Sequence, residues 1–255
     1  KMVAGLGDNR GELRLTFAKS LGSIGEDAIP VLCEALKNSS NVIIRRASAK
    51  TLNIIGNKKA LPNLIEAFES DEDPVVQGSS AGAMATIGEP AIEPLLRILT
   101  ESNCTAFQIG LINLALGFIG SKSPMGFDSA ISSKNPEIRI AALNALAEQA
   151  QKSENKDVQA LLLNALKDPD SEVRAEAATI VGKSMDPEEG AHQLHELLND
   201  KNDQVRKNTA LSLMKMESVI SIDFLEQAIQ QESDEQVRGV MIVARNQLMK
   251  HQNII

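Results

Sequence analysis

The stretch IIRRASAKTLNIIG, residues 43–56, decides the fold because the same pattern recurs along the chain. Seven other segments align with it without a gap, and in six of the eight segments the third residue is Arg. The third residues are Arg14, Arg45, Gln77, Ile109, Arg139, Arg174, Arg206 and Arg238. Their spacing of 30 to 35 residues is typical of a repeat protein.

Each segment carries apolar or small residues three and four positions apart, as in Ile44, Ala49, Leu52 and Ile55. This period predicts a helix with one buried stripe, and we call these helices the B helices. A second amphipathic run, such as residues 28–36, precedes most of them, and we call these the A helices. A pair of short helices cannot bury its apolar faces alone, so neighbouring pairs must stack.

The sequence therefore predicts an all-α fold, an α-solenoid of about eight two-helix repeats with a period of about 32 residues. We expect one repeat array over residues 1–255, with a truncated first repeat because residues 3–14 resemble the tail of an A helix and its turn. The B helices should end at glycines that adopt a left-handed conformation, namely Gly25, Gly56, Gly88 and Gly120. Helices should open at residues that precede proline, namely Asp73, Asn135 and Asp168.

Composition excludes several classes of protein. Aromatic residues are 2% of the chain, with no Trp and no Tyr, which disfavours a β-sandwich or barrel. The net charge is −8 and acidic residues are in excess in both halves, so we expect no nucleic-acid partner. Cys33 and Cys104 are too few for a disulfide framework and fit a reducing compartment, the cytoplasm or a plastid stroma.

One stretch, residues 102–121, contains no charged residue. It lies in phase with the other B helices and contains Asn103, Gln108 and Asn113, so we do not expect a membrane span. The A segment that follows is short and is interrupted by Gly126. Two interpretations remain open: this is the covered middle of the array, or it leaves an apolar face for a partner.

The motifs VRAEAA at residues 173–178 and SIGEDAI at residues 23–29 resemble those of HEAT repeats. The short, Ala-rich and Gly-ended variety is most similar to the phycobilisome-lyase type of HEAT-like repeat found in cyanobacteria. That resemblance implies a relation to the E/F-type bilin lyases and to proteins of phycobilisome turnover. Such proteins grip a phycobiliprotein subunit and help to attach, isomerise or remove an open-chain tetrapyrrole. The resemblance transfers no catalytic residue to this chain.

A second HEAT-like family, the deoxyhypusine hydroxylases, binds iron through His-Glu pairs on successive repeats. The pair here is His195-Glu196, with His192 one turn earlier and His251 near the end. A metal site needs at least three well-placed protein ligands, so we expect no metal. We interpret these histidines as solvated helix residues.

The recurring arginines predict a ladder of structural ion pairs between neighbouring repeats, formed by Arg14, Arg45, Arg139, Arg174, Arg206 and Arg238. The expected carboxylates lie just ahead of them, at Glu12, Glu137, Glu172, Asp203 and Asp234. Solenoids bind partners along a concave surface lined by their inner helices. From the helix phase we place that surface at Lys19, Ser23, Lys50, Asn53, Thr86, Asn113, Asn144, Glu148, Thr179, Lys183 and Lys215.

Two hypotheses about function follow. The first is a binding protein of phycobilisome-lyase type that acts on a phycobiliprotein subunit and takes at most a transient bilin, with no other cofactor. The second is a non-catalytic HEAT-repeat adaptor or scaffold that holds two proteins together in a complex unrelated to bilins. Family resemblance favours the first and composition favours the second. The protein partners considered are a phycobiliprotein subunit and a second HEAT-like subunit.

The predicted stripe can be tested at Leu52 and Leu146, which should both lie between helices. Leu52→Asp and Leu146→Asp would each bury a charge, and each should lower the free energy of unfolding by several kcal/mol. Thermal melting monitored by circular dichroism measures the loss. Unchanged melting of both variants would show that the assigned helix phase is wrong.

Overall fold

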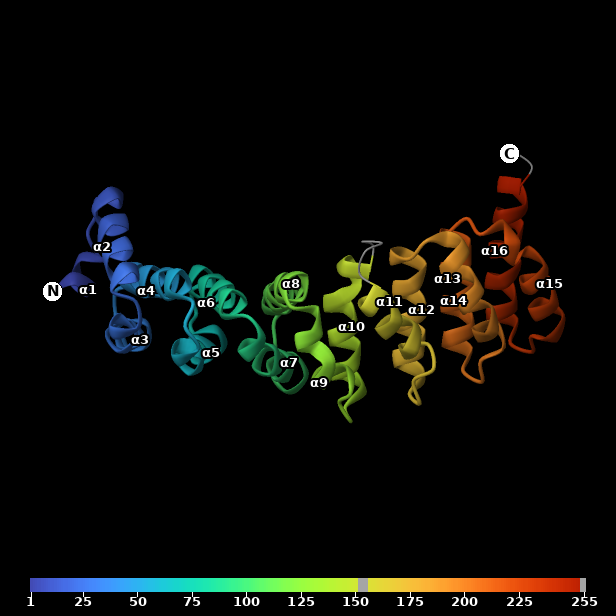
Figure 1. The fold of residues 1–255 in the computed structure, drawn as a ribbon, viewed down its shortest axis with the longest axis horizontal. Helices are drawn as coiled ribbons and strands as arrows, with labels where there is room; N and C mark the ends of the chain where they lie inside the picture. Colours follow the sequence, from blue (N-terminus) through green and yellow to red (C-terminus); the bar gives the residue numbers. More distant parts are fainter. Residues whose placement is uncertain (151–155, 253–255) are drawn as a thin grey trace. The chain divides into compact units, whose positions relative to one another are not determined.

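In the computed structural model the chain divides into two compact units, Lys1–Phe127 and Asp128–Ile255. Residues 1–150 and 156–252 are described. Throughout this part of the chain the regular structure is helical, and A and B helices alternate along the sequence (Figure 1). The all-α class and the α-solenoid of HEAT-like repeats are confirmed.

The first unit contains four B helices, each of which packs against the next in sequence. They are α2 (Gly11–Ile24), α4 (Val42–Ile55), α6 (Pro74–Ile87) and α8 (Ala106–Lys122). The short α1 (Met2–Gly5) precedes them, and the A helices between them are α3 (Ile29–Asn38), α5 (Leu61–Ser70) and α7 (Ile92–Glu101). Short 3-10 turns lead into the A helices at Gly25–Ala28, Lys58–Ala60 and Glu89–Ala91, and another follows α8 at Pro124–Phe127.

The second unit repeats this order. Its B helices are α10 (Pro136–Ala150), α12 (Ser171–Ser184), α14 (Asp203–Lys215) and α16 (Glu235–Gln252). Its A helices are α9 (Asp128–Ile131), α11 (Lys156–Ala165), α13 (Pro187–Leu194) and α15 (Ile222–Gln231), with 3-10 turns at His195–Asn199 and Val219–Ser221. The four-residue α9 agrees with the short segment that Gly126 predicted.

The core is a continuous apolar layer within each unit. Leu52 and Leu146, the two test positions, have no exposed surface. Ala49 and Ala142 are equally buried one or more turns away, and their small side chains let neighbouring helices approach closely. Burying these stripes supplies the hydrophobic free energy that a single helix pair lacks.

Side-chain caps fix where α6 and α8 begin, and both helices matter for the site. Asp73 accepts hydrogen bonds from the backbone N–H groups of Val75 and Val76, and Pro74 occupies the first helical turn. At α8 Thr105 and Gln108 form a reciprocal capping box. The Gln108 amide also donates to the Phe68 carbonyl at 3.2 Å, which ties the start of α8 to α5.

Two expected helix ends are wrong. Gly25, Gly56 and Gly88 have positive φ after their B helices, but Gly120 lies inside α8, which continues to Lys122. The extra residues give α8 a final turn whose last N–H, from Ser123, donates to the Ile119 carbonyl.

Asp168 is likewise no helix cap, because the cap of α12 is Asp170, which accepts from the N–H groups of Glu172 and Val173. Pro169 therefore precedes the cap instead of following it. This frees the Asp168 carboxylate for the contact between repeats described below.

Candidate functional site

The exposed face of the B helices carries the residues predicted as a binding surface. Ten of the eleven have described side chains and none of these ten is buried, whereas the side chain of Glu148 lies outside the described part of the chain. Asn53 and Thr86 line the same groove in the first unit. The other eight lie elsewhere on the B helices of the two units: Lys19, Ser23, Lys50, Asn113, Asn144, Thr179, Lys183 and Lys215.

The groove lies between α6 and α8 and has a volume of about 370 Å³. We call it the α6–α8 groove. Its α6 side is lined by small residues, Gly78, Ala81, Gly82 and Ala85. This volume falls in the range of pockets for small organic ligands, about 300–1,000 Å³.

The α8 side of the groove is apolar and exposed. Leu114 is 73% exposed and Phe118 is 43% exposed, and both line the groove together with Leu111. These are residues of the uncharged stretch, so the structure favours the interpretation that the stretch leaves an apolar face open. Our list of surface residues missed them because it selected polar positions, although the lack of charge over residues 102–121 was a usable signal.

Two polar features lie beside this apolar surface. The Thr86 hydroxyl lies 2.5 Å from Oδ1 of Asn53 and fixes the orientation of that amide at one end of the groove. The Lys122 ammonium lies 4.2 Å from the centre of the Phe118 ring. A cation over an aromatic face is held there by the ring quadrupole.

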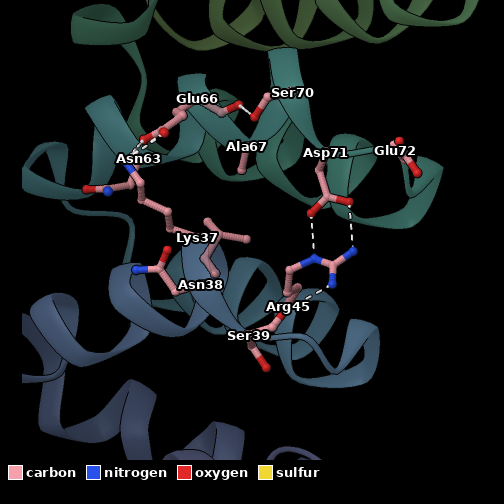
Figure 2. A pocket seen from close by; sticks show the side chains of 11 residues that line it. Lys37, Asn38, Ser39, Arg45, Asn63, Glu66, Ala67, Ser70, Asp71 and Glu72 are labelled. Carbon is pink, nitrogen blue, oxygen red and sulfur yellow. Dashed lines mark hydrogen bonds and ion pairs between the residues drawn. The ribbon is translucent and has the colours of Figure 1, made fainter.

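A second, polar pocket of about 430 Å³ lies between α3 and α5 (Figure 2). Figure 2 shows that two ion pairs cross it, Lys37 with Glu66 and Arg45 with Asp71. A pocket of about 280 Å³ lies at the equivalent position of the second unit, beside Arg206 and Glu232. Since the pocket recurs with the repeat, we assign it to helix stacking and take the α6–α8 groove as the candidate site.

The arginine side chains link neighbouring repeats in a uniform geometry. Arg45 donates through Nη1 to the Ser39 carbonyl at 3.0 Å, six residues back in its own repeat. Its Nε and Nη2 donate to the Asp71 carboxylate of the next repeat at 2.7 and 3.2 Å. Such a two-pronged contact fixes direction as well as distance.

In the second unit these contacts form a continuous ladder. Its ion pairs are Arg139–Asp168, Arg174–Asp200 and Arg206–Glu232. Each carboxylate residue also offers its backbone carbonyl to the next arginine, so Asp168 accepts from Arg174, Asp200 from Arg206 and Glu232 from Arg238.

The carboxylates that were expected to pair with these arginines are the wrong ones. Glu12, Glu137, Glu172 and Asp203 lie in the first turns of their B helices, and Asp234 accepts from backbone N–H groups at the start of α16. Glu12, Glu137 and Glu172 lie two residues ahead of their arginines, and residues two apart on a helix do not face each other. The observed partners come from the loop that follows the A helix of the next repeat.

The ladder lapses beside the groove. Gln77 reproduces half of the contact, donating through Nε2 to the Asp71 carbonyl at 2.7 Å. Ile109 stands at the arginine position of α8 and is 39% exposed. Arg14, at the other end of the unit, reaches the Asp8 carbonyl.

The carboxylate at the start of α6 has a lowered pKa. Asp73 caps α6 and receives both prongs of the Arg46 guanidinium, at 2.9 and 2.6 Å. The hydrogen bonds from Arg46 lower the pKa of Asp73 to about 2. This carboxylate therefore stays ionised and keeps the start of α6 fixed across the range of pH in which proteins are usually handled.

The interpretation of the histidines as solvated is wrong for His195. Its ring is buried, stacks on Phe224 with 3.8 Å between centroids, and lies 2.8 Å through Nε2 from the Ser221 hydroxyl. Burial lowers the pKa of His195, which favours the neutral imidazole. His192 is exposed and His251 lies 3.6 Å from Glu217. Within the described ranges we find no group of three or more His, Cys, Asp or Glu side chains placed to hold a metal ion.

The uncharged stretch is also no candidate for crossing a bilayer: within residues 1–150 and 156–252, every helix is too short or too polar to do so. Cys33 is buried, and burial raises the pKa of its thiol to about 11. Cys104 is half-buried and its Sγ lies 3.5 Å from the Ile98 carbonyl. Neither thiol lines the groove.

Stacked helix pairs linked by an arginine ladder define a class of protein, and the family model named HEAT repeats matches residues 1–85, 126–192 and 159–244. The chain belongs to the HEAT-repeat family. A particular relative is the bilin biosynthesis protein MpeU of Synechococcus sp. (strain WH8020), to which the chain is 94% identical over 251 residues, 98% of this chain and 84% of that protein.

Two solved structures are similar to this chain. The Kap95:Nup1 complex contains a chain with a TM-score of 0.50 and 15% identity, covering 98% of this chain and 40% of that one. A chain of the CpcE and CpcF complex of phycocyanin lyase from Nostoc sp. PCC7120 has a TM-score of 0.38 and 20% identity, covering 97% of this chain and 93% of that one.

The ladder makes a prediction about pH. The hydrogen bonds from Arg206 hold the pKa of Glu232 below its ordinary value, so the pair stabilises the folded state above the unfolded pKa and loses this effect as pH falls through the folded pKa. Glu232→Gln should lower the free energy of unfolding by about 1–3 kcal/mol at neutral pH. The difference from wild type should shrink towards zero in acid.

Urea unfolding at a series of pH values measures this difference. Glu226→Gln is the matched control, because Glu226 meets Arg245 at 3.8 Å on an exposed surface and its loss should cost less than about 1 kcal/mol. A loss for Glu232→Gln that did not depend on pH would contradict the assignment.

Proposed function

We propose that this chain is a HEAT-repeat protein of bilin metabolism that grips a phycobiliprotein subunit and assists the attachment or removal of its bilin. The observation that carries the proposal is the 94% identity to a bilin biosynthesis protein over nearly the whole chain. Chains this similar share their fold and most of their surface. The proposal places the chain where phycobilisomes are made, in the cytoplasm or a plastid stroma.

The geometry of the first unit supports a macromolecular partner. Leu114 and Phe118 of α8 are at least 43% exposed and line a groove of about 370 Å³, and Phe107 in the first turn of the same helix is 50% exposed. A contiguous apolar patch on a soluble protein commonly marks an interaction site. Predicted surface residues Asn53 and Thr86 flank this patch and supply polar contacts at its edge.

The second candidate is an adaptor that holds a phycobiliprotein, or another HEAT-like subunit, without acting on a bilin. The side chains of the groove are amides, hydroxyls and hydrocarbons, which suit recognition. The two candidates differ in one observable, which is whether the bilin spectrum changes when the proteins meet.

The test is size-exclusion chromatography with absorbance detection, in which the chain is mixed with apo and bilin-loaded phycobiliprotein subunits in turn. The proposal expects co-elution with at least one of them and a shift or loss of the bilin band. Because the chain has no Trp and no Tyr, its own ultraviolet absorbance is weak and the bilin signal is unobscured. Co-elution with an unchanged spectrum would favour the adaptor, and the absence of any complex would contradict both candidates.

Leu114→Glu places a charge on the exposed groove wall and should weaken the complex roughly tenfold or more. Val31→Glu is the matched control, since Val31 is 50% exposed on α3 and lies outside the groove. Equal weakening by both variants would indicate a general charge effect and would remove the groove from the interface.

A further inference from the structure

We infer that the α6–α8 groove holds the open-chain tetrapyrrole itself, with its conjugated rings on the small residues of α6 and a propionate directed to Lys122. This inference rests on the proposed function and adds the place and the contacts of the chromophore. It follows from the juxtaposition of a floor of small residues, an exposed apolar wall, an amide donor and a lysine that, among the described residues, forms no ion pair.

The floor of the groove admits a planar group. Gly78 and Gly82 lie on the face of α6 that lines it, and neither is required by the backbone, because both lie inside a helix without positive φ. A Cβ at Gly78 would lie 3.8 Å from Leu111, and one at Gly82 would lie 3.5 Å from the Asn53 amide nitrogen. Glycine disfavours a helix interior, so two of them one turn apart leave space that the fold itself does not need.

The wall favours a large hydrophobic ligand. Leu114 and Phe118 stand one turn apart on α8, and the smaller Ala115 lies between them. The side chains of Leu114 and Phe118 are partly exposed to solvent in the free protein. A conjugated chain of pyrrole rings lying on this wall would remove apolar surface from water on both partners, which is the main favourable term in such binding.

The amide of Asn53 supplies a directed donor. Its Oδ1 lies 2.5 Å from the Thr86 hydroxyl, which fixes the orientation of the amide. Among the described residues no acceptor is hydrogen-bonded to Nδ2, the nitrogen nearest to Gly82. The end rings of an open-chain tetrapyrrole carry lactam carbonyl oxygens, which accept hydrogen bonds. The Asn53 amide suits such an oxygen at this end of the groove.

Charge complementarity selects an anionic ligand. Lys122 is exposed and lies over the ring of Phe118, which belongs to the α8 wall of the groove. Within the described part of the chain no carboxylate forms an ion pair with it. Open-chain tetrapyrroles carry propionate groups on their middle rings. One propionate at Lys122 and one lactam at Asn53 would orient the chromophore along the groove.

The groove is open to solvent on the side of Leu114, whose side chain is mostly exposed. A bound tetrapyrrole would therefore be covered on one face by α6 and α8 and would keep its other face free. This arrangement suits a chromophore that has to be passed to, or taken from, a second protein. A fully enclosed site would have to open before each transfer.

The test is a titration of the purified full chain with free biliverdin, followed by the shift of its visible absorption and by induced circular dichroism. Gly82→Leu fills the floor and should weaken binding roughly tenfold or more. Gly110→Leu is the matched control: Gly110 lies on α8, no atom lies within 4 Å of its added Cβ, and it does not line the groove. Both changes replace a helical glycine with a better helix former, so thermal melting should not fall.

A second variant and a second ligand test the charge. Lys122→Gln should weaken biliverdin several-fold and should leave the affinity for biliverdin dimethyl ester, which lacks the carboxylates, unchanged. Leu114→Gln, on the exposed wall, is a second variant that tests the groove if Gly82→Leu does not fold. It should weaken the binding of both ligands. Equal loss of both ligands in Lys122→Gln would contradict the propionate contact.

Wild-type affinity in Gly82→Leu and Leu114→Gln would overturn the inference. So would the absence of any induced signal with the wild-type chain. If the chain nevertheless co-elutes with a phycobiliprotein and changes its spectrum, the proposed function stands and only the binding site assigned to the chromophore is wrong. If it does neither, both proposals fail.

Discussion

The constraint on which this structure depends is that no helix pair can bury its apolar stripe except against the next pair. A repeat of about 32 residues has two short helices and too little interior for a core of its own. Leu52 and Leu146 become fully buried because neighbouring helices cover them. The charged and polar positions of each B helix remain available to orient neighbouring repeats and to contact partner proteins.

The arginine ladder fixes the register between neighbouring repeats. Hydrophobic contact alone lets helices slide over one another, whereas a guanidinium that reaches a carbonyl in its own repeat and a carboxylate in the next one fixes the register. In the second unit Arg139, Arg174 and Arg206 follow this rule, and Arg238 makes the contact to the carbonyl of its own repeat. The free energy of each pair is modest because burial of charge opposes the attraction, so specificity of stacking is the better description of its role.

The candidate site lies where this rule lapses. At α8 the ladder position is Ile109, and the helix surface carries Leu114 and Phe118 instead of charged residues. The capping box at Thr105 and the contact of Gln108 with the Phe68 carbonyl hold α8 in place by other means. A helix that is freed from the ladder can present apolar residues on its open face, and α6 opposite it presents glycines. The groove is thus a local departure from the repeat, as sites grafted on regular folds often are.

Much of the fold followed from sequence alone. The regular recurrence of the third residue of the aligned segments, from Arg14 to Arg238, was enough to predict the helix pairs and the solenoid. Hydrophobic spacing and repeat length are local properties of the chain and do not depend on distant contacts. The lack of charge over residues 102–121 also pointed to α8, the helix that forms the exposed apolar side of the candidate groove. Gly120 and Asp168 were misjudged, since a glycine can continue a helix and a residue before proline can serve a neighbour instead of a cap.

Tertiary structure alone decided which residues meet. The carboxylate partner of Arg45 is Asp71, 26 residues away, and the partner of Arg174 is Asp200, at the same separation. It also decided that His195 is buried on Phe224, and that Asn53, Gly82 and Phe118 from three B helices line one groove. The physical reason is that a repeat length fixes the order of helices, whereas their rotation and separation depend on how side chains from different repeats pack together.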